Sequence, residues 1–159
     1  MKSKILLAGL DLNTKTLLAM KIKNHFLTEI REGDNVEGII REFVDNNFKD
    51  DDLAAIIVDE TLKLNPNREK IIGGGIRLIE ELIRECDFRP KFSVPTIYLS
   101  GFRPEEASDP LEINGPFGIY LRAKRIHRAE KFKWIVMPTN TDEILTYLIP
   151  LLRRTGAPT

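Results

Sequence analysis

Several features that mark common classes of protein are missing from this sequence. Cys86 is the single cysteine in 159 residues, which excludes an internal disulfide bond and a cysteine-rich metal site. The two histidines, His25 and His127, have no further ligand residues at metal-site spacing. No Gly-x-Ser-x-Gly motif and no Cys–His pairing indicates a nucleophile, so an ordinary hydrolase is disfavoured and we expect no enzyme activity.

Long apolar runs and an excess of charge are missing as well. The basic start MKSKILLAGL contains an apolar stretch of about six residues, whereas a bilayer span needs ~20. The 24 Lys and Arg residues balance the 24 Asp and Glu residues, so no overall field attracts nucleic acid or an anionic membrane. Together these absences predict a cytoplasmic protein that binds neither membranes nor nucleic acid, with one domain over residues 1–159.

A buried strand is predicted where the chain is most apolar. Residues 53–60 read LAAIIVDE, an unbroken apolar run that ends in two carboxylates. A strand that is apolar at successive positions must be covered on both faces, which is typical of a parallel sheet between helices. Asp59 then lies at the carboxyl end of that strand, which is the edge where ligands collect in doubly wound sheets.

Strands and helices alternate along the rest of the sequence. Apolar segments predict strands at residues 4–10, 27–30, 53–60, 92–100 and 133–137, and apolar residues at helical spacing predict helices near residues 14–26, 36–44, 76–86, 119–126 and 141–154. The spacing of Asp34 and Glu37 is that of a capping pair for the second helix. A polar loop is predicted after Glu60, and a long loop insertion at about residues 101–118.

This order predicts an α/β fold of the (βα)₅ type. Right-handed crossovers between alternating strands and helices produce a parallel sheet with helices on both faces. We expect the flavodoxin-like doubly wound plan with strand order 2-1-3-4-5, a three-layer sandwich. Helices one and five should cover one face, and helices two, three and four the other.

Three segments carry a resemblance to a known family. The segments DLAAIIVDE, VPTIYLS and WIVMPTNTDEILTYLIPLL occur in this order. Together they resemble the third strand, the fourth strand, and the fifth strand with the last helix of response-regulator receiver domains, which have the CheY-like fold. The resemblance covers nearly the whole chain. It implies that Asp59 is the phosphoacceptor equivalent and that Ser100, Trp134 and Pro138 are the phosphoryl-sensing and switch equivalents.

The sequence departs from that family at the positions that perform the chemistry. Receiver domains place two acids at the end of strand one to hold Mg²⁺, but this chain has Gly9 and Leu10 there, with Asp11 one step later. Met137 replaces the lysine that pairs with the phosphoryl oxygens, and a charge-assisted hydrogen bond contributes ~1.5 to 3 kcal/mol. The chain therefore resembles the pseudo-receiver subset. We expect no cofactor, with Mg²⁺ held by Asp11 and Asp59 only if phosphorylation occurs.

Two helices and the strand between them form the predicted output surface. The helix at 141–154 has more aliphatic residues than one stripe can bury, so some of Leu145, Leu148 and Leu152 or their neighbours, beside Tyr147, are expected to remain exposed. The one basic cluster, which includes Arg125 and Arg128, is either an ordinary solvated face or a docking site for an acidic partner. We expect a homodimer or a partner protein on this surface, which spans the fourth helix, the fifth strand and the fifth helix.

The predicted function is that of a receiver-like signal-transduction module that acts by protein–protein interaction, with impaired or absent phosphorylation of Asp59. One alternative is a working receiver of a two-component system, phosphorylated on Asp59 by a sensor histidine kinase. A second alternative is a small flavodoxin-like enzyme that binds a nucleotide or cofactor. It would use the glycines at 73–75, which either hold an anion at a helix N-terminus or only form a turn, and the long loop as a lid.

Overall fold

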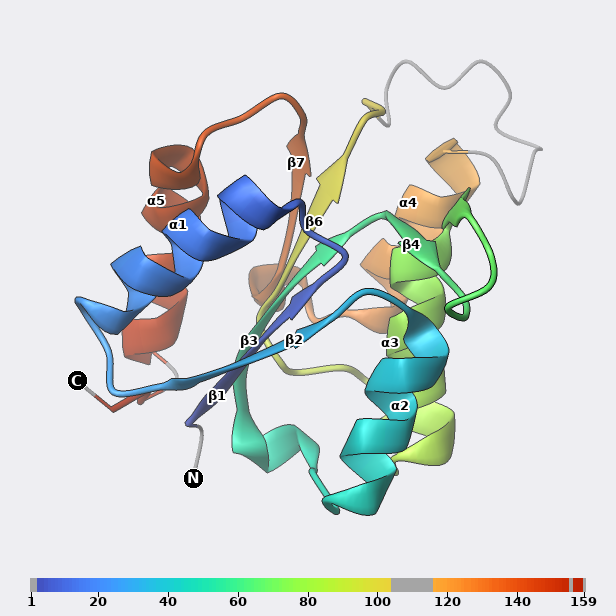
Figure 1. The fold of residues 1–159 in the computed structure, drawn as a ribbon, viewed down its shortest axis with the longest axis horizontal. Coiled ribbons are helices and arrows are strands. Elements are labelled where there is room, and N and C mark those ends of the chain that lie inside the picture. The colour runs from blue at the N-terminus through green and yellow to red at the C-terminus, as the bar shows by residue number, and fades with distance from the viewer. Residues whose placement is uncertain (1–2, 104–115, 155, 159) are drawn as a thin grey trace.

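The computed structural model describes residues 3–103, 116–154 and 156–158 of the chain. Strands and helices alternate along most of its length (Figure 1). In order, they are β1 (Lys4–Ala8), α1 (Leu12–Lys23), β2 (Glu29–Gly33), α2 (Val36–Asp45), β3 (Leu53–Asp59), β4 (Thr61–Lys63), β5 (Lys70–Ile72), α3 (Gly74–Glu85), β6 (Thr96–Ser100), α4 (Pro116–Ile126), β7 (Phe132–Val136) and α5 (Thr141–Arg154). None of the helices in the described ranges has the length and apolar content needed to cross a membrane.

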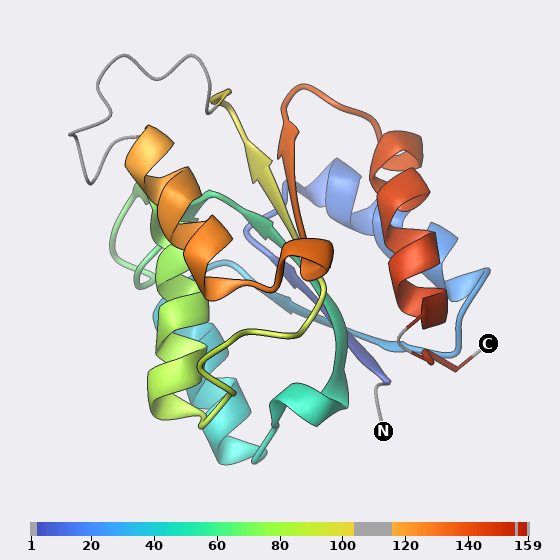
Figure 2. The same ribbon diagram turned by 180° about the vertical axis from the view of Figure 1, so that it is seen from behind.

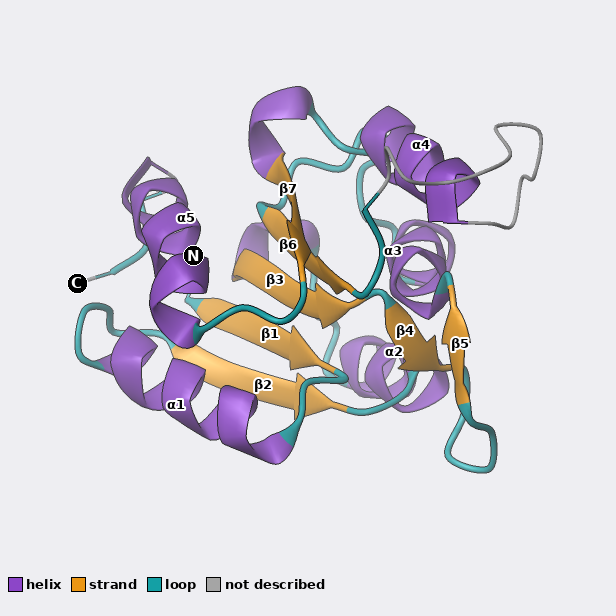
Figure 3. Cartoon of the chain, turned by 90° about the horizontal axis from the view of Figure 1, so that it is seen from above, coloured by secondary structure: helices purple, strands orange, loops and turns teal. Residues whose placement is uncertain are grey.

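Five parallel strands form the central sheet, in the order β2-β1-β3-β6-β7. Helices α1 and α5 lie on one face of this sheet, and α2, α3 and α4 lie on the other (Figure 1, Figure 2 and Figure 3). The predicted doubly wound plan with strand order 2-1-3-4-5 is therefore confirmed, because β6 and β7 are the fourth and fifth strands of the main sheet.

The central strand β3 separates two hydrophobic cores. Residues 53–58 are each 0% exposed. Ile56 and Val58 pack into the core on the side of α2, α3 and α4, whereas Ala55 and Ile57 pack into the core on the side of α1 and α5. Because successive side chains of a strand point to opposite faces, an unbroken apolar run is what a strand between two cores requires.

An antiparallel hairpin, β4–β5, lies where the sequence analysis predicted a polar loop. Its strands pair Thr61 with Ile72 and Lys63 with Lys70. The side chain of Leu62 is 0% exposed and anchors the hairpin in the core on the α2 and α3 side. The prediction was wrong here because two strands of three residues give too short an alternation to be separated from a loop.

The ends of several strands differ from the predicted positions by a few residues. Strand β1 ends at Ala8 because Gly9 leaves the extended conformation, with φ 74°. Strand β6 begins at Thr96 rather than at residue 92, because Pro95 has no N–H to donate to the ladder. Strand β2 occupies Glu29–Gly33, later than the predicted 27–30.

The cap of α2 and the start of α4 also differ from the predicted positions. Asn35, rather than Asp34, caps α2, since its side chain accepts a hydrogen bond from the Gly38 N–H at 2.7 Å. Helix α4 begins at Pro116, so the predicted loop insertion at 101–118 ends earlier. Most of that loop, residues 104–115, lies outside the described residues.

Candidate functional site

The sheet gathers the predicted site residues at one edge. Strands β1, β3, β6 and β7 run parallel, so their carboxyl ends meet there (Figure 3). Asp59 ends β3 and is paired in register with Leu99, the residue before Ser100. Gly9, directly after β1, lies beside Asp59: a Cβ added to Gly9 would be 3.4 Å from the Cβ of Asp59.

Groups of this chain itself hold the Asp59 carboxylate. Its Oδ1 accepts hydrogen bonds from the backbone N–H of Thr61 at 2.9 Å and from the Thr61 hydroxyl at 2.8 Å. Its Oδ2 lies 3.9 Å from the Nζ of Lys70, and 29% of the Asp59 side chain is exposed. Both carboxylate oxygens therefore face a donor within the chain.

Lys70 is the residue of this edge that the sequence analysis missed. It begins β5, so the hairpin brings it from eleven residues downstream to the end of β3. Its Nζ also donates a hydrogen bond to the carbonyl oxygen of Gly9 at 3.3 Å. The one signal in the sequence was the pair of short segments TLK and KII around a turn-forming Asn65-Pro66-Asn67, which fits a hairpin but does not tell where Lys70 points.

Asp11 is committed to capping α1. Its Oδ1 accepts from the Thr14 N–H at 2.9 Å, and its Oδ2 accepts from the Thr14 hydroxyl at 2.8 Å. The bonds from Thr14 lower the pKa of Asp11, and the charge of Lys70 acts in the same direction. Both carboxylate oxygens of Asp11 are thus bonded to Thr14 in the first turn of α1, and the positive charge of Lys70 has a smaller effect on its pKa.

The residues at this edge do not fit the Mg²⁺ site that receiver domains build. Mg²⁺ prefers several oxygen ligands in near-octahedral geometry. Here Gly9 and Leu10 bring no carboxylate, both oxygens of Asp11 accept from Thr14, and Asp59 faces an ammonium group. In the described ranges no group of three or more His, Cys, Asp or Glu side chains is arranged to hold a metal ion.

Glu60 is buried next to Asp59. It is 1% exposed, and its Oε1 accepts a hydrogen bond from the Gly73 N–H, while its Oε2 has no hydrogen-bond partner. Burial raises the pKa of Glu60 to about 7, the Gly73 bond opposes this rise, and the charge of Asp59 adds to it. Glu60 therefore faces the protein interior and does not add a carboxylate to the exposed part of this edge.

The glycine triplet forms a turn and a close contact. Gly73 has φ 88°, which glycine adopts without strain, and a Cβ on Gly74 would lie 2.1 Å from the Leu62 carbonyl oxygen. The N–H groups of Gly73 and Gly75 both donate to Glu60, to its side chain and its carbonyl oxygen respectively. These two donors are already used within the chain, which removes the basis for a nucleotide phosphate site here.

Ser100 and Trp134, two of the predicted switch equivalents, meet at Phe102. Ser100 is 1% exposed, and its Oγ accepts from the Phe102 N–H at 3.0 Å. The Nε1 of Trp134 donates to the Phe102 carbonyl oxygen at 3.1 Å, and the indole stacks on Tyr98 with 5.6 Å between ring centroids. Pro138, the third equivalent, is exposed and follows a cis peptide bond after Met137.

His127 belongs to an aromatic cluster with Phe92, Tyr98 and Phe132. It is 1% exposed, and its Nε2 lies 2.7 Å from the Tyr98 hydroxyl, the two groups sharing a hydrogen bond. Burial lowers the pKa of His127 to about 3, and the charge of Lys91 adds to this effect. The ring is therefore neutral at physiological pH.

The predicted exposure of the α5 leucines is wrong. Leu145, Leu148 and Leu152 are 7%, 0% and 0% exposed and pack into the core beneath α1 and α5. Helix α1 covers the same face of the sheet and contacts α5, so α5 can bury more than a single stripe of aliphatic side chains. Tyr147, at 36% exposed, is the α5 aromatic that remains at the surface.

A shallow hollow remains on the predicted output surface. It measures about 280 Å³ and lies along β7, the edge strand of the sheet, beside α5. The Nζ of Lys133 lies 4.2 Å from the ring centroid of Tyr147 in this hollow. Arg125, in the last turn of α4, and Arg128, just after that helix, are exposed and precede β7 in the sequence.

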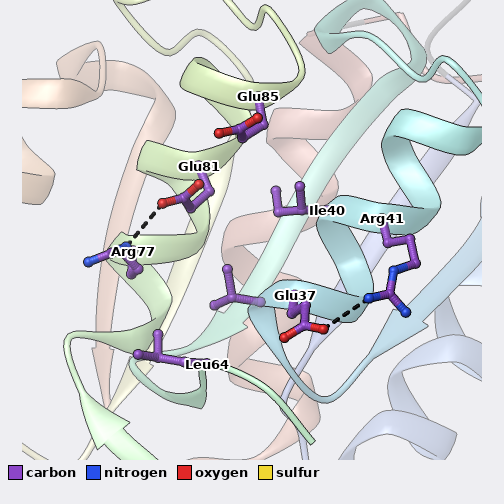
Figure 4. A pocket seen from close by; sticks show the side chains of 8 residues that line it. Glu37, Ile40, Arg41, Leu64, Arg77, Glu81 and Glu85 are labelled. Atoms are coloured by element: carbon purple, nitrogen blue, oxygen red, sulfur yellow. Dashed lines mark hydrogen bonds and ion pairs between the residues drawn. The ribbon is translucent and has the colours of Figure 1, made fainter.

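A larger hollow, of about 380 Å³, lies between α2 and α3 (Figure 4). Its lining combines apolar and charged side chains: Val36, Glu37, Ile40, Arg41, Leu64, Arg77, Glu81 and Glu85. Glu37 pairs with Arg41 at 2.9 Å and Arg77 with Glu81 at 3.1 Å, each within one helix. The sequence analysis nominated none of these residues as site residues, and their charges are largely neutralised by one another.

Comparison with known proteins agrees with the fold. The sequence matches no protein-family model and none of the curated proteins compared with it. The structure is similar to a two-component response regulator from Clostridium difficile (TM-score 0.61, 15% identity, 98% of this chain and 100% of that chain covered). It is also similar to a CheY-like response regulator receiver domain protein from Methanospirillum hungatei JF-1 (0.59, 15%, 98% and 97%) and to the BeF₃-activated N-terminal receiver domain of Klebsiella pneumoniae RstA (0.57, 14%, 95% and 99%).

These likenesses define the architecture of the chain. It has the fold of response-regulator receiver domains, as the order of DLAAIIVDE, VPTIYLS and WIVMPTNTDEILTYLIPLL predicted. At identities of 14–15%, the similarity concerns the fold, and the chemistry of the edge must be judged from the residues that this chain places there.

The buried Glu60 predicts a specific pH dependence of stability. Because the folded-state pKa, about 7, lies above the unfolded value near 4.5, the folded chain binds the proton more tightly, and stability falls as pH rises between these values. The shift corresponds to about 3 kcal/mol. Replacing Glu60→Gln removes the titration, so the variant should gain stability relative to wild type at about pH 8 and much less at about pH 5.

Urea unfolding at both pH values measures this difference. Glu69→Gln, an exposed carboxylate on the same hairpin, is the matched control and should change stability by less than ~0.5 kcal/mol at either pH. Equal effects of Glu60→Gln at the two pH values would show that Glu60 is not the titrating group.

Proposed function

We propose that this chain is a receiver-like signalling module that acts by binding other proteins and is not controlled by a phosphoryl group on Asp59. In this reading it is a binding module rather than an enzyme. The receiver fold supports a role in signal transduction. The observation that carries the rest of the proposal is that Thr61 already donates two hydrogen bonds to one oxygen of the Asp59 carboxylate, while the Lys70 ammonium group faces the other.

The groups that would stabilise a phosphoryl group support the same reading. Met137, at the position of the family's lysine, is partly buried and packs against the core beneath α1 and α5. It can place no charge on a phosphoryl oxygen. Asp11, the nearest carboxylate after β1, serves Thr14. Positioned charges contribute most of the catalysis of phosphoryl transfer, so an edge without them is a poor phosphoacceptor.

The working receiver remains the rival, since the RstA receiver domain with the same fold is described as BeF₃-activated. Incubation of the chain with acetyl phosphate and Mg²⁺, followed by intact-mass measurement, separates the two. We expect no added phosphoryl mass on the wild-type chain beyond that on Asp59→Asn. A phosphoryl adduct present on wild type and absent from Asp59→Asn would establish the rival.

The output surface is proposed to consist of α4, β7 and α5, without the three buried leucines. Its contact residues would be Tyr147, Lys133, Arg125 and Arg128, which are basic or aromatic and solvent-accessible. Glu143, at the start of α5, lines the same hollow as Lys133 and Tyr147. This mixture of charges fits a second copy of the chain or an acidic partner such as a sensor protein, because opposite charges across an interface set its orientation.

Self-association provides the test of this surface. We expect light scattering to detect a dimer at high micromolar concentration that weakens as salt rises, because the proposed contacts include exposed charges. Tyr147→Ser should abolish this dimer. The matched control is Val44→Ser, which removes an exposed apolar side chain from α2 on the other face of the sheet. A chain that stays monomeric, or loses association equally in both variants, would count against this output surface.

A further inference from the structure

The Nζ of Lys70 lies among the groups that would have to hold a divalent cation. It is 3.9 Å from the Asp59 Oδ2 and donates to the Gly9 carbonyl oxygen at 3.3 Å. Its charge also reaches Asp11, whose pKa is lowered chiefly by the Thr14 hydrogen bonds and in part by Lys70. A carboxylate oxygen and a backbone carbonyl oxygen are ligands of the kind that Mg²⁺ prefers, and here both lie beside an ammonium group.

The hairpin fixes Lys70 in this position. Leu62, on the partner strand, is fully buried, and its side chain fills the space beside Gly9, where an added Cβ would lie 2.6 Å from the Leu62 Cδ1. The backbone of Leu62 lies against Gly74, so a residue larger than glycine at position 74 would displace the hairpin. The antiparallel pairing of Lys63 with Lys70 then sets the register of β5. Lys70 thus starts from a strand that is anchored at the core.

The contacts of the Lys70 side chain are weak, so the residue can be substituted without loss of the fold. Its side chain is 46% exposed, and 3.9 Å is a long separation for an ion pair. Such partly exposed pairs contribute little to stability, so their removal should leave the fold intact. The positive charge nevertheless opposes the approach of any second cation to Asp59, since two like charges a few ångströms apart repel strongly where water is partly excluded.

We propose that Lys70 is a built-in counter-ion that takes the place of a divalent cation at Asp59, and that removing its charge raises the affinity of this edge for such a cation. The inference deepens the proposed function and rests on it, because it gives the physical reason why Asp59 is not prepared for phosphoryl transfer. It also identifies Lys70, a residue of the hairpin, as the group that sets the charge of the edge.

Titration with Mn²⁺ tests the proposal on four full-length chains: wild type, Lys70→Met, Lys70→Arg and Lys63→Met. Lys70→Met keeps an unbranched side chain, one atom shorter, and removes its charge. Lys63→Met removes the same charge from the residue paired with Lys70 on the same hairpin. Lys70→Arg keeps the charge. Circular dichroism first confirms that each variant is folded.

We expect Lys70→Met to bind Mn²⁺ at least tenfold more tightly than wild type, with paramagnetic broadening of the amide signals of Gly9 and Thr61. Lys63→Met and Lys70→Arg should behave as wild type. Adding Asp59→Asn to Lys70→Met should abolish the gain. Equal Mn²⁺ binding by Lys70→Met and Lys63→Met would overturn the proposal, because it would reflect net charge alone. So would tight Mn²⁺ binding by the wild-type chain.

The acetyl phosphate experiment, repeated on the same samples, distinguishes this inference from the proposed function. If wild type takes no phosphoryl group and Lys70→Met gains no Mn²⁺ affinity, the counter-ion role of Lys70 fails while the phosphorylation-independent function stands. If wild type is phosphorylated on Asp59, the proposed function fails as well.

Discussion

The burial of β3 on both faces is the constraint on which the rest of the structure depends. Residues 53–58 have no exposed surface, and burial of a large apolar side chain contributes about 1.5 to 3 kcal/mol. A shift of register by one residue would exchange these side chains between two cores that are already packed around them, so the packing of both cores favours the observed register. Asp59, the first residue after this run, is therefore fixed at the carboxyl edge, and the adjoining hairpin begins at a fixed point.

What the edge can do is decided by local charge, not by the net charge of the chain, which is zero. Two carboxylates, Asp59 at the end of β3 and Glu60 directly after it, have different surroundings. Asp59 is half-buried and opposed by Lys70, whereas Glu60 is buried against Gly73 and holds its proton up to about pH 7. The hairpin contributes to both arrangements: it carries Lys70 to Asp59, and its second strand, β5, ends directly before Gly73.

Much of the fold was predictable because it follows from periodicity. The five main strands, their order and the division of the helices between the two faces all follow from apolar runs alternating with amphipathic segments. The candidate site was predictable as a location, because parallel strands bring Asp59, Ser100 and the end of β1 to one edge whatever the details.

The remainder depended on contacts that no local pattern encodes. The hairpin is held by Leu62 and by the glycines that admit it, and the position of Lys70 follows from that packing and not from its neighbours in sequence. The prediction that α5 leucines are exposed was wrong for a similar reason. An aliphatic surplus on a helix shows how much must be covered, but not that a neighbouring helix such as α1 helps to cover it.

The most direct test of the account is a crystal structure of the wild-type chain grown with magnesium and beryllofluoride, which forms a phosphoryl-like adduct on receptive aspartates. The account predicts an Asp59 carboxylate without an adduct, its Oδ1 bonded to Thr61 and its Oδ2 facing the Nζ of Lys70. A beryllofluoride group on Asp59 with Mg²⁺ beside it, and Lys70 turned away, would contradict the account.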